Sequence, residues 1–156
     1  MMKLIETGDG SHTIYLTEMD ETYHSRHGAL RESMHVFIKN GLREIISRGV
    51  DPPIRIFELG LGTGLNAVLS RTEAVKFRRA IHYTTIEPHP VEPALLQSLN
   101  YESLLPHPEA GGYFQRIHEA TWDHEEQLDP YFAIKKLKIR FEDLNMTGPF
   151  FHLIYY

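Results

Sequence analysis

A run of alternating glycines constrains the fold of this chain more than any other feature. Residues 57–66 read Phe-Glu-Leu-Gly-Leu-Gly-Thr-Gly-Leu-Asn, so an apolar segment ends in Glu58 and a helical pattern begins after Gly64. Glycine permits a tight turn there and lets the backbone approach a bound ligand closely. A second carboxylate, Glu87, ends the next apolar segment. Together these features predict a nucleotide-binding strand, turn and helix.

Two classes of ligand fit a turn of this kind. Dinucleotide enzymes generally have Gly-x-Gly-x-x-Gly, which places a pyrophosphate at the helix N-terminus. Here the spacing is Gly60-x-Gly62-x-Gly64, with Glu58 two residues earlier. A carboxylate at this position repels a pyrophosphate and attracts a cationic amino group. The pattern therefore favours S-adenosylmethionine, and a NAD- or FAD-dependent oxidoreductase is the alternative.

The hydrophobic pattern along the rest of the chain alternates between strand and helix. We expect a hairpin at 4–16, strands at 54–59, 80–86, 137–141 and 150–156, and helices from 29 to 46 and at 65–77, 91–99 and 114–119. Asn40-Gly41 is expected to divide the first long helix. The continuous apolar character of the last strand indicates cover on both faces, whereas the alternative is an edge strand.

This alternation predicts an α/β fold with a parallel sheet, Rossmann-like, preceded by a β-hairpin. Residues 1–28 are interpreted as the hairpin and its lead-in segment, and residues 29–156 as a partial Rossmann-like domain. The basic run at 135–140 is interpreted as a solvated strand edge. Trp122, Tyr131 and Phe132 are interpreted as part of a satellite core.

Composition argues against several other classes. The absence of cysteine excludes disulfides and a thiol nucleophile. No long apolar stretch is present, so we expect a cytoplasmic protein without a membrane span. His24 and His27 have no third ligand at motif spacing, so no metal is expected. A net charge of -5 argues against wholesale coating of nucleic acid and leaves a local basic face open.

Four segments resemble the MnmC/MnmD family of tRNA 5-aminomethyl-2-thiouridine methyltransferases. The most specific is 58–66, which follows the pattern Glu-x-Gly-[Phe/Leu]-Gly-Thr-Gly-Leu-Asn. Residues 23–37 resemble a Tyr-x-Ser and Glu-[Ser/Thr]-x-x-Val-Phe stretch, with Arg31 in place of a glutamate. Residues 86–88 match the acidic strand end. Residues 142–144 match Gly-Asp-[Ile/Leu] with Glu142 replacing glycine, and 151–156 resemble the strand before the catalytic Asp-[Ala/Gly]-Phe.

The resemblance implies an S-adenosylmethionine-dependent N-methyltransferase that acts on 5-aminomethyl(2-thio)uridine at the wobble position of tRNA. In the family the catalytic aspartate would follow Tyr156, so we expect a truncated form of a longer parent enzyme. A fragment that binds a cofactor without catalysis is the alternative. Some family members carry a fused FAD-dependent oxidoreductase domain, which would then be a partner.

The resemblance also implies roles for individual residues. The methionine moiety is expected to contact Glu58 and the backbone of the three glycines, Gly60, Gly62 and Gly64. Asn66 is expected to cap the loop, and Glu87 to hold the ribose hydroxyls. Asp143 is expected to accept a hydrogen bond from the adenine amino group. Glu32 and Ser33 are expected to close the amino-acid end of the cofactor site.

Overall fold

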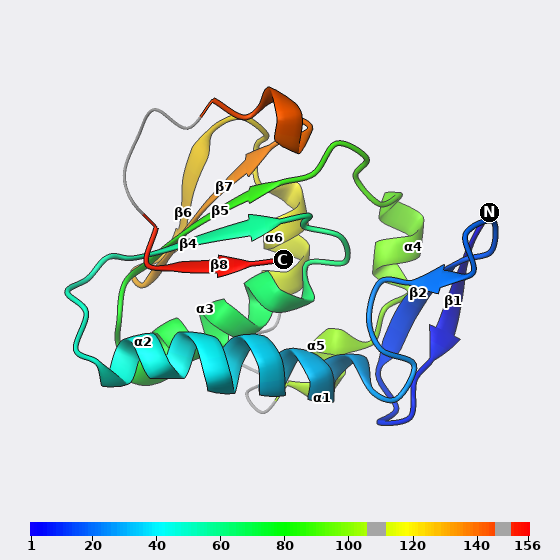
Figure 1. Ribbon diagram of the computed structural model, residues 1–156, viewed down its shortest axis with the longest axis horizontal. Coiled ribbons are helices and arrows are strands. Elements are labelled where there is room, and N and C mark those ends of the chain that lie inside the picture. Colours follow the sequence, from blue (N-terminus) through cyan, green and yellow to red (C-terminus); the bar gives the residue numbers. More distant parts are fainter. Residues whose placement is uncertain (106–111, 146–150) are drawn as a thin grey trace.

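The computed structural model describes residues 1–105, 112–145 and 151–156. A small antiparallel sheet of β1 (Met2–Glu6), β2 (His12–Leu16) and β3 (Glu21–Thr22) precedes a larger sheet with the strand order β6-β7-β5-β4-β8 (Figure 1). The strands of the larger sheet are β4 (Ile54–Leu59), β5 (Ile81–Ile86), β6 (Glu125–Asp129), β7 (Phe132–Leu137) and β8 (Leu153–Tyr155). The helices are α1 (Ala29–Ser33), η1 (Met34–Leu42), α2 (Arg43–Ser47), α3 (Leu65–Phe77), α4 (Pro93–Gln97), α5 (Tyr101–Leu104), α6 (Tyr113–Glu119) and η3 (Phe141–Asp143).

The larger sheet has the parallel arrangement that the sequence predicts. Strands β8, β4, β5 and β7 run parallel, and only β6 runs antiparallel, paired to β7. Their register aligns Glu58 of β4 with Thr85 of β5 and Tyr155 of β8. Parallel strands bring their carboxyl ends to one edge, and the small N-terminal sheet lies at that same edge (Figure 1). The α/β, Rossmann-like fold with an N-terminal antiparallel element is confirmed.

One face of this sheet forms the core. Alternate residues of β4, β5 and β7 point to it, and all are at most 3% exposed: Ile54, Ile56, Glu58, Ile81, Tyr83, Thr85, Phe132, Ile134 and Lys136. Helix α3 lies between this face and the long run of α1, η1 and α2 (Figure 1). Because side chains alternate along a strand, the last buried position of β4 is occupied by Glu58, which brings a carboxylate into the core.

The strand expected at 137–141 lies instead at Phe132–Leu137, so that prediction is wrong. The prediction failed because one residue of the basic run at 135–140, Lys136, points into the core. Lys136 is 0% exposed, its ammonium donates to the carbonyl of His118 at 2.6 Å, and it lies 4.6 Å from the Trp122 ring centre. These partners offset the cost of burying the charge. The interpretation of 135–140 as a solvated strand edge is therefore wrong at Lys136.

The long helix and the last strand also differ from the prediction. Helix η1 continues through Asn40-Gly41 as a π-helix, and a side chain at Gly41 would contact Leu153 of β8. Strand β8 lies at one edge of the described sheet, with Ile154 54% exposed and Tyr155 buried, and the cover on both faces that was expected from further chain stays a prediction. Phe150 lies outside the described residues.

Two smaller differences concern the connections. The helix expected at 91–99 is restricted to Pro93–Gln97, where proline occupies the first turn, and a separate short helix, α5, follows it. The N-terminal hairpin gains a third strand, β3. The aromatic residues Trp122, Tyr131 and Phe132 belong to the main core or pack against it, where a satellite core was expected.

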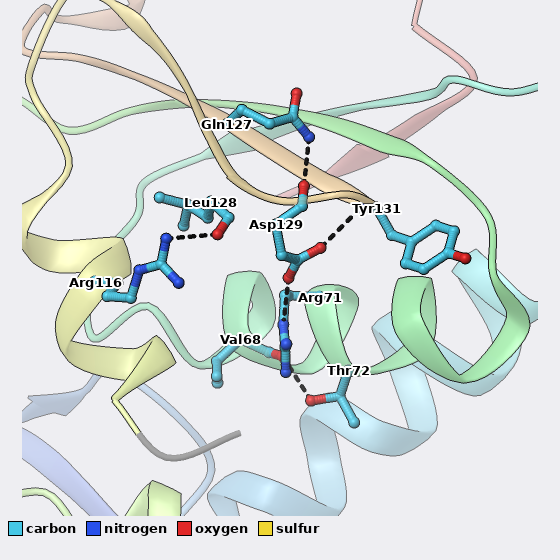
Figure 2. Close-up of polar contacts among 8 residues, drawn as sticks. All are labelled: Val68, Arg71, Thr72, Arg116, Gln127, Leu128, Asp129 and Tyr131. Carbon is cyan, nitrogen blue, oxygen red and sulfur yellow. Dashed lines mark hydrogen bonds and ion pairs between the residues drawn. The ribbon is translucent and has the colours of Figure 1, made fainter. Parts of the chain in front are cut away.

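A buried ion pair joins α3 to the end of β6 (Figure 2). The Arg71 guanidinium donates to Asp129 at 2.8 Å, and the second carboxylate oxygen accepts from the Tyr131 amide at 2.8 Å. The guanidinium also lies 3.3 Å from the centre of the Tyr113 ring of α6. Figure 2 shows that Arg116 of α6 reaches the carbonyl of Leu128 beside this pair. We call these contacts the Arg71–Asp129 clamp.

Candidate cofactor-binding site

The glycine loop between β4 and α3 has a left-handed backbone at each of its three glycines. The φ angles are +89° at Gly60, +52° at Gly62 and +77° at Gly64. A Cβ at Gly62 would lie 2.8 Å from the Tyr23 ring, and one at Gly64 would lie 2.7 Å from Nε2 of His118. A Cβ at Gly60 would meet no atom within 4 Å. Glycine is therefore required by packing as well as conformation at two positions, and by conformation alone at the first.

A cavity of about 390 Å³ lies on one side of this loop. We call it the Glu58 cavity. Its lining comprises Tyr23, His24, Glu32, Val36, Phe37, residues 58–63, Leu65, Asn66, Tyr155 and Tyr156. Two carboxylates and several aromatic rings are present, and among the described residues no lysine or arginine lines it. A cavity with this lining attracts cations, through the carboxylates and through the ring faces.

Glu58 is buried in this cavity with half of its carboxyl group unpartnered. It is 3% exposed, and Oε1 accepts from Asn66 Nδ2 at 3.2 Å. Burial raises the pKa of Glu58 to about 8, and the nearby side chains of Tyr83 and Asn66 lower it only in part. Within the described residues, four buried oxygens here lack a hydrogen-bond partner: Glu58 Oε2, Asn66 Oδ1, Tyr83 Oη and Thr85 Oγ1.

Such unpartnered groups are costly in a folded protein. A ligand that brings donors into the Glu58 cavity would satisfy Oε2 of Glu58. A cationic ligand would also stabilise the ionised carboxylate and lower its pKa from the raised value. The geometry therefore fits a ligand with a cationic amino group better than a ligand with a phosphate at this position.

Glu87, at the end of the neighbouring strand, accepts one backbone hydrogen bond at each carboxylate oxygen. Its Oε2 accepts from the Gly62 amide at 3.0 Å and its Oε1 accepts from the His89 amide at 2.9 Å. It therefore fastens the glycine loop to the end of β5. Glu87 also lines a larger cavity of about 690 Å³, which shares Leu61 and Gly62 with the Glu58 cavity and which we call the Glu87 cavity. Each carboxylate oxygen has more than one acceptor site, so a further donor can still be accepted.

Of the other residues expected at the site, some line the Glu58 cavity and others line neither cavity. Glu32 lines the Glu58 cavity and accepts from the Ser25 amide at 2.8 Å. Ser33 is fully buried and lines neither cavity. Asp143 is exposed on η3 and also lines neither cavity. Asn66 pairs with Glu58, where a cap of the loop was expected. The assigned roles of these residues stay predictions.

Sequence reasoning missed the residues that hold the loop from outside. His118 of α6 donates from Nε2 to the Thr63 carbonyl at 3.0 Å, and burial lowers its pKa to about 4. Tyr23 packs on Gly62. Tyr23 begins the matched segment 23–37, but no role was expected for it, and no pattern pointed to His118, since both contacts join distant parts of the chain. Tyr83 and Thr85 lie on the same face of β5. The alternation of side chains along that strand was the one sequence signal for their burial beside Glu58.

The comparisons with known proteins bear on the fold. No protein-family model matches the chain, and no curated protein matches it. Among solved structures, the crystal structure of MnmC2 from Aquifex aeolicus matches with a TM-score of 0.68 at 22% sequence identity. The match covers 88% of this chain and 42% of that chain, so this chain spans less than half the length of that protein. The resemblance to MnmC is thus confirmed at the level of the fold.

The described residues contain no cluster of three or more histidine, cysteine, aspartate or glutamate side chains that could bind a metal ion. None of the helices in the described part of the chain has the length and hydropathy to cross a membrane.

Proposed function

We propose that this chain is the S-adenosylmethionine-binding part of a tRNA-modifying methyltransferase. One observation carries the proposal: the Glu58 cavity offers a buried, half-unpartnered carboxylate beside a left-handed glycine loop, with no lysine or arginine in the described lining. The amino-acid part of S-adenosylmethionine presents an ammonium group, and its sulfonium is a second cation. Both fit a cavity of carboxylates and aromatic rings. The likeness of fold to MnmC2 agrees with this proposal.

The two cavities suggest how the parts of the ligand are divided. Leu61 and Gly62 line both, so an extended ligand can cross the glycine loop from one cavity to the other. We assign the methionine moiety to the Glu58 cavity, with Glu58 as the partner of the ammonium group. The ribose is assigned to Glu87 and the adenine to the Glu87 cavity. The contact between adenine and Asp143 rests on the family resemblance alone.

The chemistry of the bound cofactor is transfer of its activated methyl group. The chain's own residues hold and orient it: Glu58 balances the ammonium, Glu87 fixes the ribose and the loop, and Tyr23 covers Gly62. Positioning of this kind converts a bimolecular reaction into an effectively intramolecular one. Following the resemblance, we propose 5-aminomethyl(2-thio)uridine at the tRNA wobble position as the methyl acceptor, in a cytoplasmic enzyme.

The catalytic group and a further partner belong to the same proposal. In the family the catalytic aspartate follows the strand that residues 151–156 resemble, and the proposal assigns to this chain the cofactor site. An FAD-dependent oxidoreductase domain, fused or separate, is proposed as a partner on the same basis. The competing oxidoreductase function for this chain is disfavoured because a dinucleotide pyrophosphate would face Glu58 and Glu32 without a cation to balance it.

Calorimetric titration with S-adenosylhomocysteine, and separately with NAD, tests the cofactor. We expect selective binding of S-adenosylhomocysteine. The variant Glu58→Gln should bind it at least about tenfold more weakly, a loss of roughly 1.4 kcal/mol. Glu44→Gln, an exposed glutamate on α2, is the matched control and should bind as the unmodified chain does. Binding of NAD alone would overturn the proposal.

A further inference from the structure

His118 holds the glycine loop with one ring nitrogen and presents the other as a hydrogen-bond acceptor. Nε2 lies 3.0 Å from the Thr63 carbonyl oxygen, which can only accept, so Nε2 carries a hydrogen. Burial lowers the pKa of His118 to about 4, and the charge of Lys136 lowers it further. The ring is therefore neutral near pH 7, and Nδ1 carries a lone pair.

Nδ1 of His118 is open to a ligand. It forms no hydrogen bond within the part of the chain that the structure describes, yet it is not one of the buried unpartnered atoms there, so it is accessible. The His118 side chain lines the Glu87 cavity. Thr63 and the Phe114 ring, whose centre lies 4.8 Å from that of His118, hold the imidazole in place. His118 thus offers a fixed acceptor at the wall of this cavity.

The rest of the Glu87 cavity suits a flat aromatic ring. Its volume of about 690 Å³ is in the range of small-molecule sites. Much of its lining is apolar: Leu61, Val91, Leu96, Leu99, Phe114 and Trp122. The two aromatic side chains can pack against the face or the edge of a bound base.

The other side-chain acceptors in this lining are on exposed side chains or are already engaged. The Asn100 side chain accepts one hydrogen bond from the backbone of the N-terminal hairpin and donates another to it, each at 2.8 Å. Glu102 accepts from the Phe114 amide at 3.1 Å. Asp143, to which the family resemblance gives the adenine amino group, is not part of the lining. His118 therefore supplies the acceptor that Asp143 does not place in this cavity.

We propose that Nδ1 of His118 accepts a hydrogen bond from the 6-amino group of adenine in the Glu87 cavity and so selects a 6-aminopurine over a 6-oxopurine. This inference rests on the proposed function, which assigns the adenine to this cavity. An amino group donates, whereas the oxygen of a 6-oxopurine only accepts and would face the Nδ1 lone pair. Two acceptors that face each other lose the bond and leave both groups unsatisfied. The amino group carries two hydrogens, so the bond to His118 does not exclude a second one to Asp143.

The test compares binding of S-adenosylhomocysteine and of S-inosylhomocysteine, its 6-oxo counterpart, by calorimetry. The unmodified chain should prefer the amino ligand at least about tenfold, on the scale of one hydrogen bond and the mismatch that replaces it. His118→Gln places an amide nitrogen near the position of Nε2 and no acceptor at that of Nδ1, so it should keep the bond to Thr63 and lose the preference. His118→Asn places an amide oxygen near the position of Nδ1, so it should lose the bond to Thr63 and keep the preference.

The ratio of the two affinities separates recognition of the base from support of the loop. Because both ligands are measured on each variant, a change in stability affects both affinities and cancels from their ratio. The melting temperature should fall in His118→Asn and change little in His118→Gln. Glu92→Gln, at an exposed acid of the same cavity, is the control and should keep the preference.

Two results would overturn the role of His118: an unmodified chain without a preference between the ligands, or a preference that His118→Gln retains in full. An unmodified chain that binds neither ligand overturns the proposed function, and the role of His118 with it.

Discussion

Asp129 and Glu58 are both buried carboxylates, and the structure treats them in opposite ways. The side chain of Asp129 is 6% exposed, and both of its oxygens accept hydrogen bonds within the Arg71–Asp129 clamp (Figure 2). Glu58 is 3% exposed, has one partner, Asn66, and leaves Oε2 without one in the described residues. The first carboxylate is part of a closed structural network. The second lines a cavity and keeps one buried oxygen without a partner in the described residues.

Under the proposed function, the Asp129 carboxylate stabilises the fold and the Glu58 carboxyl group binds the ligand. Breaking a buried ion pair leaves an uncompensated charge, so it is costly for stability. An unpartnered buried carboxyl is already costly in the absence of ligand, which its pKa of about 8 reflects. Substitutions at the clamp should therefore change stability, and substitutions at the glycine loop should change binding.

The largest effect is expected from Arg71→Met. This variant leaves Asp129 buried without its cation, so the free energy of unfolding should fall by about 3–5 kcal/mol, as measured by urea denaturation. Arg26→Met serves as the control, because the pair with Asp20 is largely exposed and its loss should leave the midpoint unchanged. Equal losses in the free energy of unfolding in the two variants would contradict a stabilising role of the clamp.

A smaller effect is expected on ligand binding from Glu87→Ala. The substitution removes the proposed ribose partner and also releases the Gly62 amide. Affinity for S-adenosylhomocysteine, measured by calorimetry, should fall at least about tenfold, or roughly 1.4 kcal/mol. Glu92→Ala changes an exposed acid of the same cavity and should have little effect. If Glu87→Ala binds normally, the ribose assignment fails.

A further effect expected is a pH-dependent gain in stability in Glu58→Gln. The pKa of Glu58 in the folded chain is about 8, above its ordinary value of 4.5. The neutral form thus favours folding, and stability falls as pH rises from about 4.5 through about 8. Glutamine stays neutral, so the melting temperature should be at least about 3 °C higher than that of the unmodified chain near pH 9.

The gain in Glu58→Gln should disappear below about pH 4.5, where the glutamate is protonated in both states. Glu44→Gln, at an exposed site, should show no such pH dependence. A melting temperature of Glu58→Gln that is no higher near pH 9 would mean that the carboxylate is better solvated or better paired than its surroundings indicate.

The glycine loop and its flanking strands could be predicted because their signal is local. Left-handed turns require glycine, and a strand of apolar residues that ends in Glu58 is readable from neighbouring positions alone. Strand β7 could not be placed, because the burial of Lys136 depends on the carbonyl of His118 and on Trp122, which lie elsewhere in the chain. Patterns of hydrophobicity do not record such partners.

The candidate site shows the same division. The positions of Glu58 and Glu87 follow from the order of the strands, whereas the packing of Tyr23 on Gly62 depends on how the N-terminal segment returns to the loop. Asp143 shows the limit of a motif match: its segment was recognised, yet it lies exposed on η3, outside the lining of both cavities.

The most direct test of the account is to divide the ligand between the two cavities. Calorimetry would compare S-adenosylhomocysteine with 5′-methylthioadenosine, which lacks the amino-acid part, on the unmodified chain, Glu58→Gln and Glu87→Ala. We predict that Glu58→Gln weakens only S-adenosylhomocysteine and that Glu87→Ala weakens both ligands. Equal weakening of both ligands by Glu58→Gln, or of neither, would contradict the assignment of Glu58 to the cationic amino group.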